Sequence, residues 1–405
     1  MSVQKYPGRV LSKTPPTITP PVDGEGGSAP GVWTLSEALE NEKAGTWPKP
    51  LFAAELYMFG EGLDGQIGND AAVSVSSPVQ VGATSDWRRV TTGSTTTLAL
   101  KSNGTLWGWG GNNFGALGLN QATSEKYSSP VQVGALTTWD AVEMESNVFA
   151  ITTNNELYAW GRGQFGALGN NDTASLSSPV QIGALTNWSR VTPGVLHCVS
   201  VKTDGTLWTW GLNSNGELGH NNTTYLSSPV QVGSLTTWTK SMSAGNTFTH
   251  AINSSGELYG WGRNNLGQVG NNSVDNVSSP VQIGALADWS SLAAGENFVL
   301  AVKTDGTLWG WGINNRGQLA QNNVVSFSSP VQVGALTNWS QITCTDESAL
   351  AVKTDGTLWA LGKGLEGQTG QNDAADRSSP VQVGVETSWV KVFKATGDTV
   401  AALAK

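Results

Sequence analysis

Charged side chains are scarce in this sequence of 405 residues, where Asp, Glu, Lys and Arg together make up 13%. The 22 basic residues are scattered along the chain, and the formal net charge is −9. A nucleic-acid-binding surface needs clustered Lys and Arg, so we expect no nucleic-acid partner. Low charge combined with 18 tryptophans also excludes a disordered chain.

Cysteines and long apolar runs are also few. The two cysteines, Cys198 and Cys344, fall in repeats that are not neighbours, so we expect no disulfide. No run of about 18 apolar residues occurs, and we therefore expect no membrane-spanning segment. The beginning of the chain, MSVQKYPGRVLSKTPPTITPP, lacks the apolar core of a signal peptide. These features predict folding in a cytoplasm.

Glycine, in contrast, is plentiful at 50 residues, and three short patterns recur seven times. One is the strand-like LWGWG and its variants. Another is SSPVQ, at intervals of 49 to 52 residues, with its prolines at Pro78, Pro130, Pro179, Pro229, Pro280, Pro330 and Pro380. The third is a tryptophan nine residues after each of these prolines. A period of this length indicates a propeller or solenoid architecture.

Each repeat reads as about four short strands. In VKTDGTLWGWG, alternating apolar residues run into Asp-Gly and then resume, which is typical of a β-hairpin. A Gly-rich loop follows, then SSPVQ with its proline at a strand start, then the strand WxxVxxG. Four strands per repeat and seven repeats predict an all-β, seven-bladed β-propeller over residues 51–405.

The hairpin turn KTDG and its relatives appear only six times, and the missing seventh falls at the two ends of the array. We therefore predict one blade shared between the ends, with an inner strand from Val400–Lys405 beside Glu55–Gly60. Such closure removes the exposed edges of an open sheet. Removal of the last eight residues is expected to open the ring.

The repeat unit, with its W…V…G and LAVKTDGTLWGWGxNxxGQLG patterns, resembles the regulator of chromosome condensation repeat over nearly the whole of residues 51–405. The resemblance implies a seven-bladed propeller closed by strands from both termini. The founding branch of that family exchanges nucleotide on a small GTPase and sits on chromatin. Here the even repeat spacing leaves no room for a long inserted wedge, and the pI of about 4.9 argues against chromatin. Exchange activity is not carried over.

Chemistry-bearing motifs are missing from the repeats. HExxH, CxxC and GxxxxGK[ST] do not occur, and the three histidines His197, His220 and His250 are scattered. We interpret His197 and His250 as blade hydrogen-bonding residues. We therefore predict no metal, no cofactor and no enzymatic activity. A glycan-degrading enzyme would need a pair of carboxylates that breaks the repeat symmetry, and we find none in the sequence.

Several polar and aromatic residues recur in register. We interpret Asp204, Asp305 and Asp355 as turn residues, and the paired tryptophans of LWGWG as packing between blades. A set of lysines is interpreted as solvated strand ends. These lysines are Lys101, Lys202, Lys303 and Lys353.

The loops after each GxLG are polar, short and variable, such as NNDTASLSS and HNNTTYLSS. Asparagine there is either a turn residue or part of a multivalent binding rim, since a rigid scaffold that presents seven related loops gains by effective concentration. The candidate ligand contacts, for a host glycan or receptor among others, are Asn171, Asn221, Asn222, Asn271, Asn272 and Asn322.

Residues 1–50 resemble none of the repeats and read as an extended Pro- and Gly-rich arm. Within it, a capping box of Thr34 and Glu37 and a terminating Gly45 predict one short helix over about residues 34–44. A helix of this length is not stable alone, so its apolar face must dock on the propeller or on another subunit. The docking residues are Trp33, Leu35, Leu39 and Trp47.

The stretch PGVWTLSEALENEKAGTWP within the arm resembles a short module of marine bacteriophage tail and appendage proteins. This resemblance implies a non-enzymatic structural virion protein, attached to other virion proteins through the arm and oligomeric in the particle. Its localisation would be the virion, after synthesis in the host cytoplasm. The alternative is a cellular propeller scaffold or a guanine-nucleotide-exchange-type interaction module.

Overall fold

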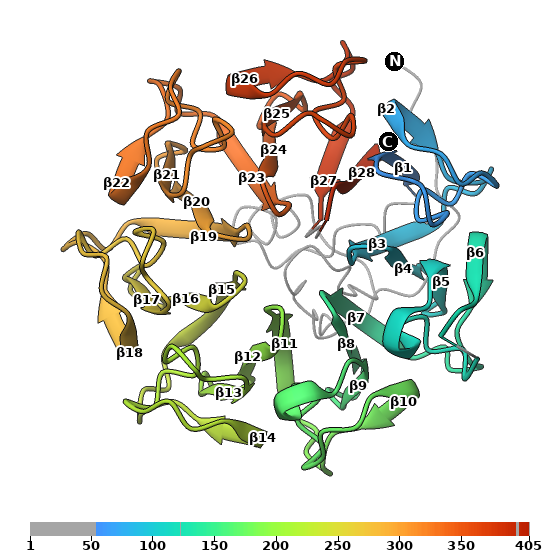
Figure 1. Ribbon diagram of the computed structural model, residues 1–405, viewed down its shortest axis with the longest axis horizontal. Helices are drawn as coiled ribbons and strands as arrows, with labels where there is room; N and C mark the ends of the chain where they lie inside the picture. Colours follow the sequence, from blue (N-terminus) through green and yellow to red (C-terminus); the bar gives the residue numbers. More distant parts are fainter. Residues whose placement is uncertain (1–53, 122, 394–396, 405) are drawn as a thin grey trace, which may run out of the picture. The chain divides into compact units, whose positions relative to one another are not determined.

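The computed structural model describes residues 54–121, 123–393 and 397–404. In these residues the chain forms seven four-stranded antiparallel sheets arranged as blades around one axis (Figure 1). The predicted all-β seven-bladed propeller is therefore confirmed. The predicted arm and its helix at residues 34–44 lie outside the described residues.

Each blade runs from an innermost strand beside the axis to an outermost strand at the rim (Figure 1). The innermost strands are β3 (Trp87–Thr92), β7 (Trp139–Met144), β11 (Trp188–Pro193), β15 (Trp238–Ala244), β19 (Trp289–Ala294), β23 (Trp339–Cys344) and β27 (Trp389–Val392). The second strands are β4 (Thr96–Lys101), β8 (Asn147–Thr152), β12 (His197–Lys202), β16 (Phe248–Asn253), β20 (Phe298–Lys303), β24 (Ser348–Lys353) and β28 (Thr399–Ala404). Almost every residue of the second strands is buried, because neighbouring strands and blades enclose them.

The LWGWG pattern forms the third strand of each blade, and SSPVQ lies in the outermost one. The third strands are β5 (Leu106–Gly111), β9 (Leu157–Gly161), β13 (Leu207–Gly211), β17 (Leu258–Gly262), β21 (Leu308–Gly312), β25 (Leu358–Gly362) and β1 (Glu55–Gly60). The outermost strands are β6 (Lys126–Gln132), β10 (Leu176–Gln181), β14 (Leu226–Gln231), β18 (Val277–Gln282), β22 (Phe327–Gln332), β26 (Arg377–Gln382) and β2 (Val75–Gln80). Two short 3-10 helices, η1 (Asn113–Gly115) and η2 (Gln164–Gly166), lie in the loops that follow β5 and β9.

Hairpin turns join the second and third strands, as the Asp-Gly pairs predict. Asp204 accepts hydrogen bonds from the backbone N–H of Thr206 at 3.0 Å and from its hydroxyl at 2.6 Å. Gly205 has φ 75°, and a Cβ there would lie 2.2 Å from the carbonyl oxygen of Thr236. The interpretation of these aspartates as turn residues is confirmed, because side-chain acceptors stabilise this backbone conformation.

The prolines of SSPVQ do not begin the outermost strands, contrary to the sequence-based prediction. Pro78 is the fourth residue of β2, and the β1–β2 register shifts between Met58 and Gly60. An irregular edge strand tolerates proline, because its missing N–H removes no bond that the strand ladder needs there.

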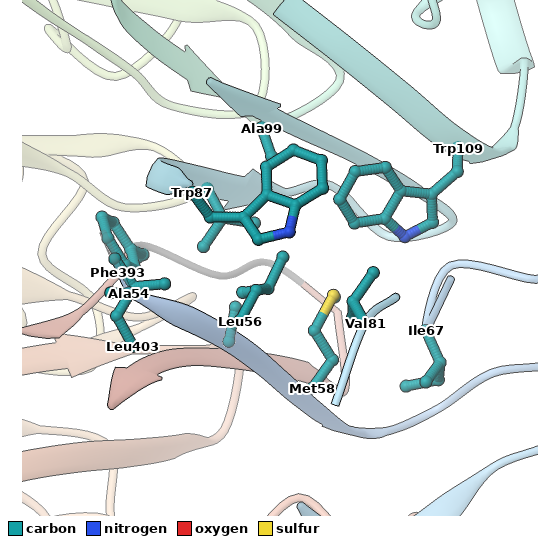
Figure 2. Packing of buried hydrophobic residues seen from close by; sticks show 12 residues of the cluster. Ala54, Leu56, Met58, Ile67, Val81, Trp87, Ala99, Trp109, Phe393 and Leu403 are labelled. Atoms are coloured by element: carbon teal, nitrogen blue, oxygen red, sulfur yellow. The ribbon is translucent and has the colours of Figure 1, made fainter. Parts of the chain in front are cut away.

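The closing blade combines both ends of the array, as predicted. β28 pairs with β1 without a register break, from Glu55 opposite Ala404 to Gly60 opposite Thr399. These are the two middle strands of the blade, since β27 lies inside them and β2 outside. Figure 2 shows Leu56 and Met58 of β1 packed with Trp87 and Trp109 of the adjacent blade.

Buried tryptophans connect neighbouring blades. The indole N–H of Trp109 donates to the carbonyl oxygen of Gln66 at 2.9 Å, and that of Trp210 donates to Ala167 at 3.1 Å. Both rings are fully buried. The interpretation as packing between blades is confirmed for the second tryptophan of each pair, whose ring fills the interface and whose polar atom is hydrogen-bonded across it. The first is partly exposed, and its indole N–H donates within its own blade, as Trp208 does to the Thr206 hydroxyl at 2.8 Å.

The lysines at the ends of the second strands are not solvated, so that interpretation was wrong. Lys202 and Lys303 are each only 5% exposed. The Lys202 ammonium lies 4.7 Å from the Trp188 ring centroid and 3.5 Å from that of Trp208. Cation–π attraction and burial of the alkyl stem explain why lysine is accommodated between two rings there.

Candidate functional site

Alternation of strand direction places the connections of each blade on two opposite faces of the ring. One face, which we call the loop face, carries the long loops between third and outermost strands. It also carries short turns between innermost and second strands, at residues 93–95, 145–146, 194–196, 245–247, 295–297 and 345–347. The opposite face, which we call the hairpin face, carries the hairpin turns and the connections from one blade to the next.

Acidic side chains gather at the axis on the loop face. Glu145, Glu296 and Asp346 come from three of the short turns and line one small cavity, together with Asn246. The cavity has a volume of about 20 Å³, enough for about one water molecule. We call this group of four residues the acidic mouth.

Backbone hydrogen bonds hold the turns of the acidic mouth together. The N–H of Asn246 donates to the carbonyl oxygen of Glu296 at 3.1 Å, and the N–H of Glu296 donates to that of Asp346 at 3.0 Å. The Asn246 side-chain amide also donates to a Glu296 carboxylate oxygen at 3.2 Å. Glu296 and Asp346 are therefore positioned by main-chain contacts between blades, and little rearrangement is needed to present their carboxylates to a ligand. The Glu145 carboxylate is held within its own turn by the Ser146 N–H at 2.5 Å.

The electrostatics of the acidic mouth are unfavourable for its own charges. The pKa of Asp346 is raised to about 7, mainly by burial and also by the nearby carboxylates of Glu145, Glu296 and Asp398, while a backbone hydrogen bond from Gly397 opposes the shift. Like charges in a half-buried site disfavour ionisation. A cation placed here would relieve that repulsion.

Two basic side chains of the loop face, Lys363 and Arg316, pair with carboxylates outside the acidic mouth. The Lys363 ammonium is 2.8 Å from the Asp398 carboxylate and 3.6 Å from that of Glu347. Arg316 reaches Glu347 at 4.0 Å and Asp376 at 3.5 Å. Within the described residues, no Lys or Arg forms an ion pair with Glu145, Glu296 or Asp346. The three carboxylates are therefore available to a cationic partner.

The predicted loop contacts lie farther out on the same face and have structural roles. Four of them adopt left-handed backbone conformations, with φ of 56° to 63°, and each donates its N–H to a serine carbonyl of the next blade's outermost strand at 2.7–2.8 Å. They are Asn171, Asn221, Asn272 and Asn322. Asparagine favours this conformation more than most residues. Their contact with a ligand stays a prediction.

The other two predicted contacts hold their own loops. Asn222 accepts from the N–H of Thr224 at 2.9 Å, and Asn271 accepts from the Asn264 side-chain amide at 3.0 Å. The structure therefore places the six asparagines in four of the seven related loops and not in one shared cavity. The predicted docking residues Trp33, Leu35, Leu39 and Trp47 lie outside the described residues.

Sequence reasoning missed the acidic mouth. Its signal was a single variable position just before the second strand, which reads Glu296 in GENF, Asp346 in TDES and Asn246 in GNTF. One acidic residue per repeat looks like an ordinary polar turn. Only ring closure brings these residues, about 50 positions apart in the chain, to one axis.

Two of the three histidines, His197 and His250, and both cysteines lie in the core. His197 shares a hydrogen bond with Thr249 of the next blade at 3.0 Å, and His250 with the Val269 carbonyl at 2.9 Å. Burial lowers the pKa of His250 to about 4. Both cysteines are buried, and they form no disulfide with each other, as predicted. The described ranges contain no group of three or more His, Cys, Asp or Glu side chains that could hold a metal ion. They also contain no helix that could cross a membrane.

The sequence is similar to those of known propeller proteins. A family model for the RCC1-like domain matches residues 55–403. The chain belongs to the RCC1-like domain family. It is 32% identical over 237 residues to the ultraviolet-B receptor UVR8 of Arabidopsis thaliana, across 56% of this chain and 53% of that receptor. It is 29% identical over 126 residues to the human E3 ubiquitin-protein ligase HERC2, across 28% of this chain and 3% of that ligase.

Solved structures of this family share the fold. Human WBSCR16 superposes with a TM-score of 0.77 at 18% identity, across 87% of this chain and 99% of that one. Prp20p of Saccharomyces cerevisiae also gives 0.77, at 19% identity, across 87% of this chain and 91% of that one. The chain spans about half the length of UVR8 and far less of HERC2, so the similarity does not cover the whole of either protein.

Proposed function

We propose that this chain is a non-enzymatic interaction module whose acidic mouth binds a basic side chain or segment of a partner protein. The observation that carries the proposal is the convergence of Glu145, Glu296 and Asp346 at one mouth of the ring, with a raised Asp346 pKa. A bound ammonium or guanidinium would favour the ionised carboxylates, and the preorganised turns would keep the entropic cost of binding low.

Several of the relatives are described by their binding partners or as a receptor, although HERC2 is a ubiquitin ligase. Prp20p is described by its binding to Gsp1p and to histones, and a second structure shows Kap60 bound to yeast RCC1. UVR8 is a receptor. These are proteins of plants and fungi, so they favour the cellular scaffold over the virion protein. Carrying a protein-binding role over to this chain is our proposal.

Titration with a fluorescent octalysine peptide tests the acidic mouth, with octaglutamate as the control peptide. We expect E145Q/E296Q to weaken octalysine binding strongly. The matched control D172N/D275N removes two exposed carboxylates of the loop face outside the acidic mouth and should leave most of the affinity. An equal loss in both variants would mean that only net charge matters, and the proposed site would be abandoned.

A phage particle is the second candidate setting for this module. The observation that favours it is the arm motif, in which Gly31–Leu35 and Ala44–Pro48 match the phage appendage module. In that setting the arm would bind other virion proteins, the protein would be oligomeric, and the loops would contact a host glycan or receptor. Gold-labelled antibody against the propeller, imaged on particles from the source culture, tests it. Label inside uninfected cells, with bare particles, would exclude it.

A further inference from the structure

Four blades hold a lysine ammonium between two tryptophan rings on the hairpin face. One ring comes from the innermost strand and the other from the third strand, with ammonium-to-centroid distances between 3.5 and 4.9 Å. The four lysines are Lys101, Lys202, Lys303 and Lys353. The recurrence shows that this position in a blade is built to accommodate an alkylammonium group.

The closing blade has one tryptophan and one tyrosine in place of the two tryptophans, and it lacks the lysine. Ala404 pairs with Trp389 as Lys202 pairs with Trp188, so alanine occupies the lysine position. The third strand, β1, supplies Tyr57, whose ring lies edge-on to Trp389 at 5.6 Å. A cavity of about 330 Å³ is lined by Trp389, Tyr57 and Ala404. We call this cavity the closing-blade pocket.

Two other blades also lack the lysine, but their own side chains hydrogen-bond the local glutamate. Thr152 donates to Glu156 at 2.9 Å, and Asn253 donates to Glu257 at 2.6 Å. The equivalent glutamate of the closing blade is Glu55, which accepts from the Tyr57 hydroxyl at 2.7 Å. Ala404 has no donor to offer it. In the closing blade this carboxylate therefore lines an open pocket.

A second carboxylate lines the closing-blade pocket and breaks the repeat pattern. The connection that leads into Trp389 reads GVETSW, and Glu386 stands where five of the other six connections carry leucine and the sixth carries Thr84. These leucines are Leu136, Leu185, Leu235, Leu286 and Leu336. The charge of Glu386 acts on the pocket. The pKa of Tyr57 is raised by its hydrogen bond to Glu55, by burial and by the charges of Glu55 and Glu386.

We propose that the closing-blade pocket binds the side chain of a lysine presented by a partner polypeptide. Trp389 and Tyr57 would contact the alkyl stem and the ammonium, and Glu55 and Glu386 would accept its hydrogen bonds. The ligand thereby supplies the group that four other blades contain themselves. This site lies on the hairpin face, opposite the acidic mouth, and does not depend on the proposed function.

The test uses the full chain with K405A, which removes the neighbouring lysine outside the described residues. The probes are Nα-acetyl-lysine methylamide and Nα-acetyl-norleucine methylamide, which differ in the ammonium. Binding is followed by calorimetry and by the Trp389 indole signal in ¹H–¹⁵N spectra. We expect saturable binding of the lysine probe, and weaker binding of the norleucine probe by about tenfold or more.

Two variants decide the outcome. A404K installs the lysine of the other blades, so it should fold and should abolish probe binding. E386L restores the leucine of the repeats and should weaken binding by about tenfold, because it removes one charged acceptor. Equal binding of both probes, or unchanged lysine binding in A404K and E386L, would overturn the proposal. If A404K does not fold, the comparison of E386L with the parent decides the outcome.

Discussion

Replacing Asp346 with asparagine should stabilise this protein above pH 7 and leave it unchanged near pH 4. The substitution keeps the size of the side chain and removes a half-buried negative charge that faces Glu145, Glu296 and Asp398. The pKa of Asp346 is about 7 in the folded protein, against 3.8 for an ordinary aspartate. The folded protein thus holds the proton to higher pH than the unfolded chain does.

The sign and size of the effect follow from that difference. Stability contributed by the neutral carboxyl is complete below pH 3.8 and is lost as the pH rises through about 7. A shift of about three units corresponds to about 4 kcal/mol at most. Solvent screening at the half-buried mouth reduces this to about 2 kcal/mol, since the effective dielectric constant there is high.

Urea unfolding followed by tryptophan fluorescence between pH 4 and 8 measures the effect. The gain of D346N over the parent should grow with pH and level off above 7. E347Q is the matched control, because Glu347 is adjacent but lies 3.6 Å from the Lys363 ammonium, so its removal should not stabilise. A pH-independent difference, or a destabilised D346N at pH 8, would refute the reasoning about the acidic mouth.

One truncation and two sets of substitutions test the fold. Removing residues 398–405 should cost at least about 4 kcal/mol, because Val400 and Leu403 are 0% and 4% exposed; unchanged thermal stability would contradict closure by β28. Because burial lowers the His250 pKa to about 4, the parent should lose up to about 3 kcal/mol of unfolding free energy as the pH falls from 6.5 to 4. H250L should remove this loss, so that its free energy of unfolding depends less on pH. Because Asn171 has φ 63°, N171A should lower the free energy of unfolding by about 1 kcal/mol and N171G should leave it almost unchanged. Equal losses in the two variants would show that the asparagine side chain, and not the backbone conformation, is responsible.

The repeats made the fold predictable, because each pattern reports a local property. Asp204-Gly205 reports a tight turn, and the missing seventh turn located the shared blade between Glu55 and Ala404. The lysines were misjudged for a related reason. A charged residue at the end of a strand is usually exposed to solvent. Only the spatial pairing of Trp188 with Trp208 shows that Lys202 is buried.

The two candidate sites were not predictable from local patterns. The acidic mouth depends on residues such as Glu145 and Asp346 meeting at the axis, which requires the closed ring. The closing-blade pocket depends on an alanine where four of the other six repeats carry lysine, and on a glutamate where five of them carry leucine. Those departures are visible in the sequence, but their meaning requires knowing that Ala404 and Glu386 line the same cavity.

The pairing of β28 with β1 also has a consequence for the order of folding. The Thr399 hydroxyl donates to the Glu61 carbonyl across 338 residues of chain, whereas the hairpins of the other blades join strands a few residues apart. Closing so long a loop costs about 4 kcal/mol more in chain entropy than closing a hairpin turn of about five residues. On the ribosome, β1 and β2 therefore emerge first but wait for their partner until nearly all of the chain has been made. Translation speed and chaperone protection of that waiting edge should set the yield of closed rings.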